Sequence, residues 1–179
     1  MRVAWVNVFA TVFLTGCGDL PSVEGLANKE NTVFDPALVG AWNAGDAVII
    51  VQKGEDNSYR IHWVGAEGST DTPRFVRMEG RLVKIGEQRI LDLTAARQDA
   101  FSIPCHVFLR IRPVNDGLKV QFIDSKWIRE QARALPGFVQ DGHPVLTGPA
   151  AQVEALLVKF GFDERALDDP MVLRPLKQK

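Results

Sequence analysis

Short stretches in which apolar and polar residues alternate recur along the middle of the chain. The clearest covers residues 58–64, where Tyr59, Ile61 and Trp63 share one face. A period of two predicts β-strands. Similar strands are expected at residues 47–51, 73–85, 88–93, 105–112 and 118–124. Because tight turns separate them, roughly six or seven short strands are predicted to form an antiparallel meander that closes into a barrel.

The alternation also predicts which side chains fill the barrel. The inward set is apolar and consists of Tyr59, Ile61, Trp63, Leu91, Leu93, Val107, Leu109, Ile111, Leu118, Val120 and Phe122. The opposite set is polar, is expected to face solvent, and consists of Arg60, His62, Asp92, Arg110, Arg112, Lys119 and Gln121. Because the inward side chains are large, a small barrel filled with them is expected to be packed rather than hollow.

The pattern changes after residue 124 and predicts helices that cover the barrel. Ser125 is placed to cap a helix over residues 125–134, and Thr147 to cap a second helix over residues 149–160. Residues 171–176 are expected to add an edge strand or to lie over the core. The predicted fold is therefore mainly β: one antiparallel barrel domain over residues 34–179 with one or two C-terminal helices packed on it.

The start of the chain has the pattern of an export signal. Arg2 precedes an apolar run over residues 3–14, which is shorter than the roughly 20 residues of a membrane-spanning helix. The run ends in Leu14-Thr15-Gly16-Cys17, and this ending resembles the lipobox of bacterial lipoproteins. The resemblance implies a signal peptide over residues 1–16 and cleavage between Gly16 and Cys17. It also implies a lipid, with acyl chains such as palmitate, on the thiol of Cys17.

A lipid on Cys17 would place the protein in the cell envelope, anchored to a membrane. In enterobacterial lipoproteins an Asp directly after the cysteine favours the inner membrane, whereas here Gly18 follows Cys17. The outer membrane is therefore favoured over the inner one. Residues 17–33 show no period, and Pro21 and Gly25 interrupt any regular element. We expect these residues to form a flexible tether.

The first strand of the barrel domain carries a second resemblance. Asp35 followed by Pro36 is a helix-start signal, and Gly40-Ala41-Trp42 comes directly after that turn. A Gly-x-Trp sequence in this place resembles the first strand of lipocalins. The resemblance implies that Trp42 plugs one end of the barrel and that Gly40 permits close backbone approach. It also implies a carrier of a lipid or another apolar ligand.

Sequence motifs of catalytic or metal sites are absent. The three histidines, His62, His106 and His143, have neither metal-ligand spacing nor a carboxylate at a paired position. A glycine-rich phosphate loop and a Gly-x-Ser-x-Gly motif are also missing. We therefore expect no metal, no cofactor and no enzymatic activity. The sequence identifies no ligand-binding residues.

Charge and cysteine usage narrow the range of partners. Removal of residues 1–16 takes away one basic residue, Arg2, and leaves 21 − 1 = 20 basic against 22 acidic residues, a formal charge of −2. Such a balance does not favour nucleic acid. With Cys17 acylated, Cys105 has no disulfide partner in the chain and is expected to be buried. The sequence thus predicts a lipid-anchored binding or structural module with a membrane and a protein or apolar ligand as partners. A carrier of apolar ligands is the alternative.

Overall fold

The computed structural model describes residues 21–67, 70–95, 105–123, 138–139 and 145–176. Gly16 and Cys17 of the expected lipobox, the helix expected over residues 125–134, and His143 lie outside these residues. Among the described residues, none of the helices combines the length and the apolar character needed to cross a bilayer.

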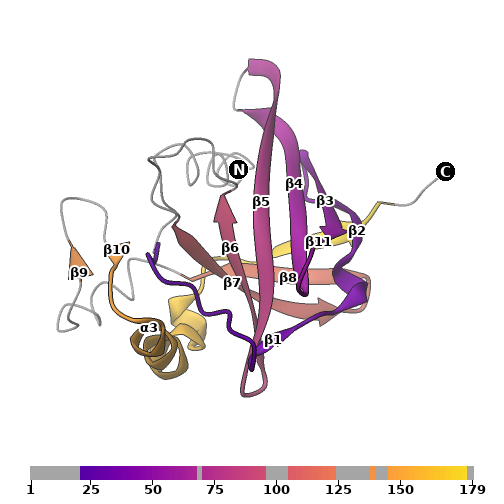
Figure 1. Cartoon of the computed structure of the whole chain (residues 1–179). Coiled ribbons are helices and arrows are strands. Elements are labelled where there is room, and N and C mark those ends of the chain that lie inside the picture. Colours follow the sequence, from indigo (N-terminus) through magenta and orange to yellow (C-terminus); the bar gives the residue numbers. More distant parts are fainter. Residues whose placement is uncertain (1–20, 68–69, 96–104, 124–137, 140–144, 177–179) are drawn as a thin grey trace.

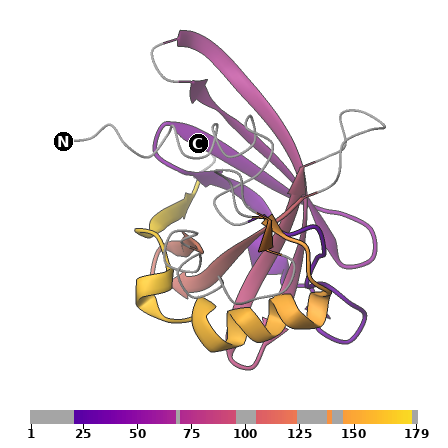
Figure 2. The same ribbon diagram turned by 90° about the vertical axis from the view of Figure 1, so that its left-hand side faces the viewer.

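Eight antiparallel strands close into a barrel (Figures 1 and 2). They are β2 (Gly40–Asn43), β3 (Ala47–Lys53), β4 (Ser58–Glu67), β5 (Thr70–Ile85), β6 (Gln88–Ala95), β7 (His106–Val114), β8 (Gly117–Phe122) and β11 (Met171–Pro175). Strand β5 pairs with β4 and, from Met78 onward, also with β6. The β4–β5 hairpin extends beyond the rest of the barrel (Figure 1). The predicted fold class, a mainly β meander closed into a barrel, is confirmed.

The last strand has a different place from the one expected. Strand β11 is neither an edge strand nor a cover, because it lies between β8 and β2. Met171 is opposite Val120 of β8, and Pro175 is opposite Trp42 of β2. Without β11, the meander from β2 to β8 would have two unpaired edges. The strand hydrogen-bonds to both of them and closes the ring, which removes the edges.

The barrel interior holds the first hydrophobic core. The predicted inward residues are all buried in it except Phe122, which is half-buried and packs against it. Tyr59 and Leu82 are inaccessible to solvent, and Trp42 and Leu173 complete the core from β2 and β11. Successive side chains of a strand point to opposite faces, so the period of two was sufficient to assign these residues to the interior.

A second core lies outside the barrel wall, under the helical cover that the sequence predicted, but the wall side chains that form it were not predicted. Its barrel side chains are Val83 and Ile85 of β5, Ile90 of β6 and Phe108 of β7. Helix α3 (Ala150–Leu156), the π-helix η2 (Leu157–Gly161) and the 3₁₀ turn η3 (Glu164–Ala166) cover this wall, as Figure 2 shows for the helices. The helix expected over residues 149–160 is therefore present. It packs through the buried residues Val153, Leu156 and Leu157.

The start of helix α3 differs from the prediction. Pro149, not Thr147, occupies the N-cap position, and no side chain caps the helix there. Thr147 lies two residues too early for its hydroxyl to serve as the N-cap oxygen. By contrast, the 3₁₀ turn η1 (Pro36–Leu38) starts where the Asp35-Pro36 pair predicts, and the Asp35 carboxylate accepts a hydrogen bond from the Ala37 amide at 2.8 Å.

The segment before the barrel is docked on its outer wall, which corrects the flexible tether expected for residues 17–33 over its described part. We call residues 21–33 the strap. Ser22 exchanges two backbone hydrogen bonds with His106, at 2.9 and 2.7 Å, and Leu26 is buried in the second core. The strap ends in strand β1 (Thr32–Val33), which pairs with β5. Pro21 and Gly25 exclude a helix, but they do not prevent an extended chain from pairing with a sheet.

The strap also meets a short hairpin outside the barrel. This hairpin consists of β9 (Phe138–Val139) and β10 (Val145–Leu146). The amide of Val23 donates to the Leu146 carbonyl at 2.9 Å, and the Leu146 amide donates to the Pro21 carbonyl at 2.8 Å. The strap is therefore held between β7 on one side and β10 on the other.

Candidate functional site

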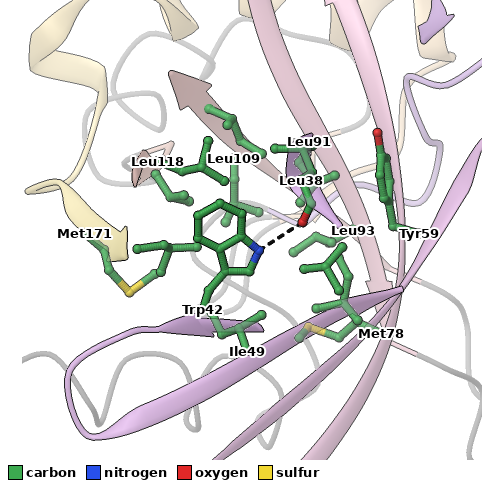
Figure 3. A pocket seen from close by; sticks show the side chains of 15 residues that line it. Leu38, Trp42, Ile49, Tyr59, Met78, Leu91, Leu93, Leu109, Leu118 and Met171 are labelled. Carbon is green, nitrogen blue, oxygen red and sulfur yellow. Dashed lines mark hydrogen bonds between the residues drawn. The ribbon is translucent and has the colours of Figure 1, made fainter. Parts of the chain in front are cut away.

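The interior of the barrel contains an apolar cavity of about 50 Å³ (Figure 3). Strands β2 to β8, strand β11 and the 3₁₀ turn η1 all contribute to its lining. The lining residues are Leu38, Trp42, Ile49, Val51, Tyr59, Ile61, Met78, Leu91, Leu93, Leu109, Ile111, Leu118, Val120, Met171 and Leu173. The expectation that the barrel is packed is met over most of the interior, and this void is the exception.

The two polar groups in the lining are already hydrogen-bonded to the backbone. The indole Nε1 of Trp42 donates to the carbonyl of Leu38 at 2.9 Å (Figure 3). The hydroxyl of Tyr59 accepts from the amide of Asp35 at 2.7 Å and lies 3.3 Å from its carbonyl. Burial raises the pKa of this phenol, so it stays neutral. A ligand in the cavity would therefore find hydrocarbon and thioether surface, with no polar group left to pair.

The dimensions of the cavity limit what can enter it. Drug-sized ligands occupy pockets of roughly 300–1,000 Å³, several times the volume present here. Apolar cavities without polar partners stay dry, so the void is available to an apolar guest of modest size. Met78 and Met171 line it, and methionine side chains are flexible enough to change the shape of a cavity.

Trp42 lies at the first strand of the barrel, as the lipocalin resemblance implies. Its side chain is 7% exposed and belongs to the interior core. Gly40 has a different role from the implied one, because a Cβ there would have no atom within 4 Å. Its φ of +150° is instead a backbone conformation that residues with a side chain rarely adopt. Cys105 is half-buried and not fully buried as expected.

The outer face of the barrel corrects the prediction that its polar side chains face solvent. Asp92, Arg110 and Gln121 point outward as predicted, yet they are buried, at 4%, 1% and 4% exposure. The strap covers Asp92, whose Oδ2 accepts from the Leu26 amide. The residues around η3 cover the other two, because the Gln121 amide donates to the Asp168 carbonyl at 3.1 Å. The polarity of these side chains predicts a solvated face. It does not show that the strap and the residues around η3 cover the strands.

Arg110 is the most deeply buried charge in the described part of the chain. Its Nη2 donates to Gln121 Oε1 and to Glu164 Oε1, both at 2.8 Å, and Arg112 also donates to Glu164, at 3.0 Å. Burial lowers the pKa of Arg110. The hydrogen bond from Arg110 is the main cause that lowers the pKa of Glu164 below its usual value. This ion pair joins η3 to the barrel and has a structural role.

A second cluster of polar residues lies where the strap crosses strands β5, β6 and β7. His106 Nδ1 is 2.6 Å from Asp92 Oδ1, and Oδ2 of the same carboxylate accepts from the amides of Leu26 at 2.8 Å and Ala27 at 3.3 Å. Gly25 lies against the pair, since a Cβ there would be 2.4 Å from His106 Cε1. The sequence offered no signal for this pair, because Asp92 and His106 lie on different strands and become diagonal neighbours only through the β6–β7 register, in which Thr94 is opposite His106.

Beside this pair is a polar pocket of about 220 Å³ on the outside of the barrel. It is lined by Glu24, Gly25, Ala27, Glu79, Gly80, Arg81, Asp92, Thr94 and His106. Within the described residues, no three His, Cys, Asp or Glu side chains are placed to hold a metal ion. His62 is not among the lining residues: it is opposite Arg77 of β5, and its ring stacks on Phe75 at a centroid distance of 5.3 Å.

Comparisons with known proteins add no relative to this description. No protein-family model matches the chain, and no curated protein or solved structure gives a match. The assignment of a function therefore rests on the sequence and on the geometry of the barrel.

Proposed function

We propose that this protein is a lipid-anchored binding module of the bacterial cell envelope, attached to a membrane at Cys17, whose barrel accepts a small apolar group. The observation that carries the binding part is the interior cavity, which is lined only by apolar side chains and by polar groups that are already paired. The attachment rests on the lipobox-like Leu14-Thr15-Gly16-Cys17. Gly18 after the cysteine supports the outer membrane as the location.

Binding in such a cavity depends on size and hydrophobicity. An apolar guest releases about 25 cal/mol for each Å² of apolar surface removed from water, and no buried polar group is left unpaired. With about 50 Å³ available, the guest is a short hydrocarbon group, such as the end of a chain, and not a complete lipid. A structural module differs only in leaving the void empty.

A carrier of a whole lipid is the second candidate, and the methionines in the lining are the observation in its favour. Met78 and Met171 contribute side chains to the cavity wall, and methionine rotamers rearrange at low cost. A carrier requires this rearrangement to enlarge the cavity severalfold. Chain length of the preferred guest therefore separates the two functions.

Methionine methyl NMR tests the binding proposal directly. The chain has three methionines, and two of them line the cavity, while Met1 lies in the proposed signal peptide. We expect xenon and propane to shift both cavity methyl signals saturably, and hexadecanoate to have no stronger effect. Tighter binding of hexadecanoate would instead favour the lipid carrier. If no apolar probe moves either signal, the cavity does not bind a ligand.

A matched pair of substitutions controls this measurement. Leu118 lines the cavity and Leu176 is 45% exposed, so Leu118→Phe should fill the void and abolish the shifts. Leu176→Phe makes the same replacement outside and should leave them unchanged. Equal binding by both variants would place the guest elsewhere on the protein.

The anchor is tested by the two cysteines. Each buried methylene contributes about 0.8 kcal/mol, so a single acyl chain binds a membrane only marginally. Stable attachment therefore needs more than one chain. Cys17→Ala should abolish lipid incorporation and move the protein from the detergent phase to the aqueous phase, whereas Cys105→Ala should leave both unchanged. Unchanged partitioning of Cys17→Ala would refute the lipoprotein assignment. For the protein without substitutions, separation of inner and outer membranes would show which of the two holds it.

A further inference from the structure

The polar pocket outside the barrel has features that the interior cavity lacks. Three strands form its floor: Glu79 of β5 is opposite Thr94 of β6, which is opposite His106 of β7. In the next outward-facing row, Arg81 is opposite Asp92. The strap, through Glu24, Gly25 and Ala27, forms the remaining side. The pocket is about 220 Å³ in volume, large enough for a small polar molecule.

The histidine in this pocket is oriented and has one nitrogen left for a ligand. Oδ2 of the Asp92 carboxylate accepts hydrogen bonds from two backbone amides, those of Leu26 and Ala27. Since a carboxylate only accepts hydrogen bonds, His106 Nδ1 carries the proton in the 2.6 Å contact. In the neutral ring, Nε2 then has a lone pair and accepts a hydrogen bond. The side chain is 23% exposed and lines the pocket.

The charge of the pocket selects the kind of ligand. Three carboxylates, Glu24, Glu79 and Asp92, face one guanidinium, Arg81. An anion would meet this excess of negative charge and an imidazole lone pair, whereas a cation with N–H donors would be attracted by both. A metal ion is not favoured, because the described residues contain no suitable group of ligands.

We propose that this pocket is a binding site for a primary ammonium group, which donates to His106 Nε2 and pairs with the Glu79 carboxylate. The Thr94 hydroxyl, between these two in the same row, can bond a neighbouring hydroxyl or ether oxygen of the ligand. The site is separate from the interior cavity, which lies on the other side of the barrel wall, so either site can fail without the other.

Histidine ring NMR on the full-length protein in neutral detergent micelles tests this site. The three histidines give three signals. Ethanolammonium chloride is the probe, and choline chloride at equal ionic strength has the same charge without N–H donors. We expect ethanolammonium to shift the His106 signal saturably and choline to do so less. Equal shifts from both salts, or no shift of His106, would overturn the proposal.

Two glutamates on the same strand pair provide matched variants. Glu79 lines the pocket, and Glu87 is an exposed residue in the turn after β5. Glu79→Gln should weaken ethanolammonium binding roughly two- to fivefold, the effect of one exposed charge pair, and Glu87→Gln should not. Equal affinity of Glu79→Gln and the unchanged protein would overturn the assignment.

The ammonium group has two possible sources, a soluble amine and a lipid headgroup. Vesicles of phosphatidylcholine with and without phosphatidylethanolamine separate them. A His106 shift that requires phosphatidylethanolamine identifies a headgroup at the membrane to which Cys17 would attach the protein. A shift with free ethanolammonium but with neither vesicle identifies a soluble amine. Both results support the ammonium site.

Discussion

Replacement of Trp42 by alanine measures how much the barrel depends on its first strand. The indole is 7% exposed, and a tryptophan buries roughly 150–250 Å². At about 25 cal/mol per Å², its loss corresponds to about 4–6 kcal/mol as an upper limit. Measured large-to-small substitutions of this kind cost about 3–5 kcal/mol. The substitution also removes the hydrogen bond to the Leu38 carbonyl.

Two features place Trp42→Ala in the upper part of this range. The strands around the site form a closed hydrogen-bonded ring, which cannot contract to fill the space. The new void is also continuous with the cavity of about 50 Å³ that Trp42 already lines. We therefore expect a loss of about 4–5 kcal/mol in the free energy of unfolding. Trp42→Phe, which keeps most of the ring surface, should cost about 1–2 kcal/mol.

Urea denaturation followed by far-ultraviolet circular dichroism is the suitable assay, because the substitution removes a fluorophore. Phe75 is the control: its ring is 53% exposed, and it contacts His62 and Arg77 on the outer surface. Phe75→Ala should cost less than about 1 kcal/mol. If Trp42→Ala costs as little, the indole does not support the barrel core and the reasoning is wrong. In a folded Trp42→Ala protein, the enlarged cavity should bind octanoate more tightly than the unchanged protein does.

Three further substitutions test the strap, the first strand and the buried ion pair. Gly25→Ala places a methyl group 2.4 Å from His106 Cε1, so it should cost about 1–3 kcal/mol and lower amide protection in the strap, which hydrogen exchange would detect. Gly40→Val should cost about 1–3 kcal/mol in urea denaturation, because φ is +150° there. Glu164 has its pKa lowered below 4.5, chiefly by Arg110. The stability it contributes is complete above pH 4.5 and is lost as the pH falls through the lowered value, so Glu164→Gln should flatten the acid side of a pH–stability curve.

Two of these changes, Gly25→Ala and Glu164→Gln, have a control in the chain. At Gly148 an added methyl group would meet only the flexible side chain of Gln152, so Gly148→Ala should be nearly neutral. Glu87→Gln changes an exposed glutamate in a turn and should leave the acid side of the curve as it is. A Gly25→Ala protein as stable as Gly148→Ala would show that the strap does not press on His106.

The barrel was predictable because its signal is local. Each strand carries its own period of two, and the inward residues can be assigned without knowing which strands are neighbours. Strand β11 was assigned wrongly, because Met171–Pro175 is too short to show a period and its position between β8 and β2 depends on closure of the whole ring. Local patterns predict that the meander closes, but they do not show which strand completes the ring.

The sequence contains a signal for the second core that the strand predictions did not use. Leu82-Val83, Ile90-Leu91 and Val107-Phe108-Leu109 are runs of consecutive apolar residues within otherwise alternating strands. Such runs indicate a strand that is buried on both faces. The structure shows the reason, since Val83, Ile90 and Phe108 face the strap and helix α3. Burial of Asp92 and Arg110 follows from the same cover, and it required knowledge of which segments lie over the wall.

The docked strap changes where the proposed anchor would hold the barrel. A free tether over residues 17–33 would leave the domain roughly 20–25 Å from the lipid, in any orientation. Ser22 is instead fixed to His106 by two backbone hydrogen bonds, and it is five positions after Cys17, since 22 − 17 = 5. Five residues span at most about 18 Å. An anchor at Cys17 would therefore keep the β6–β7 wall and the His106 pocket no farther from the membrane than these five residues can span. The strap would set which face of the barrel lies toward the lipid.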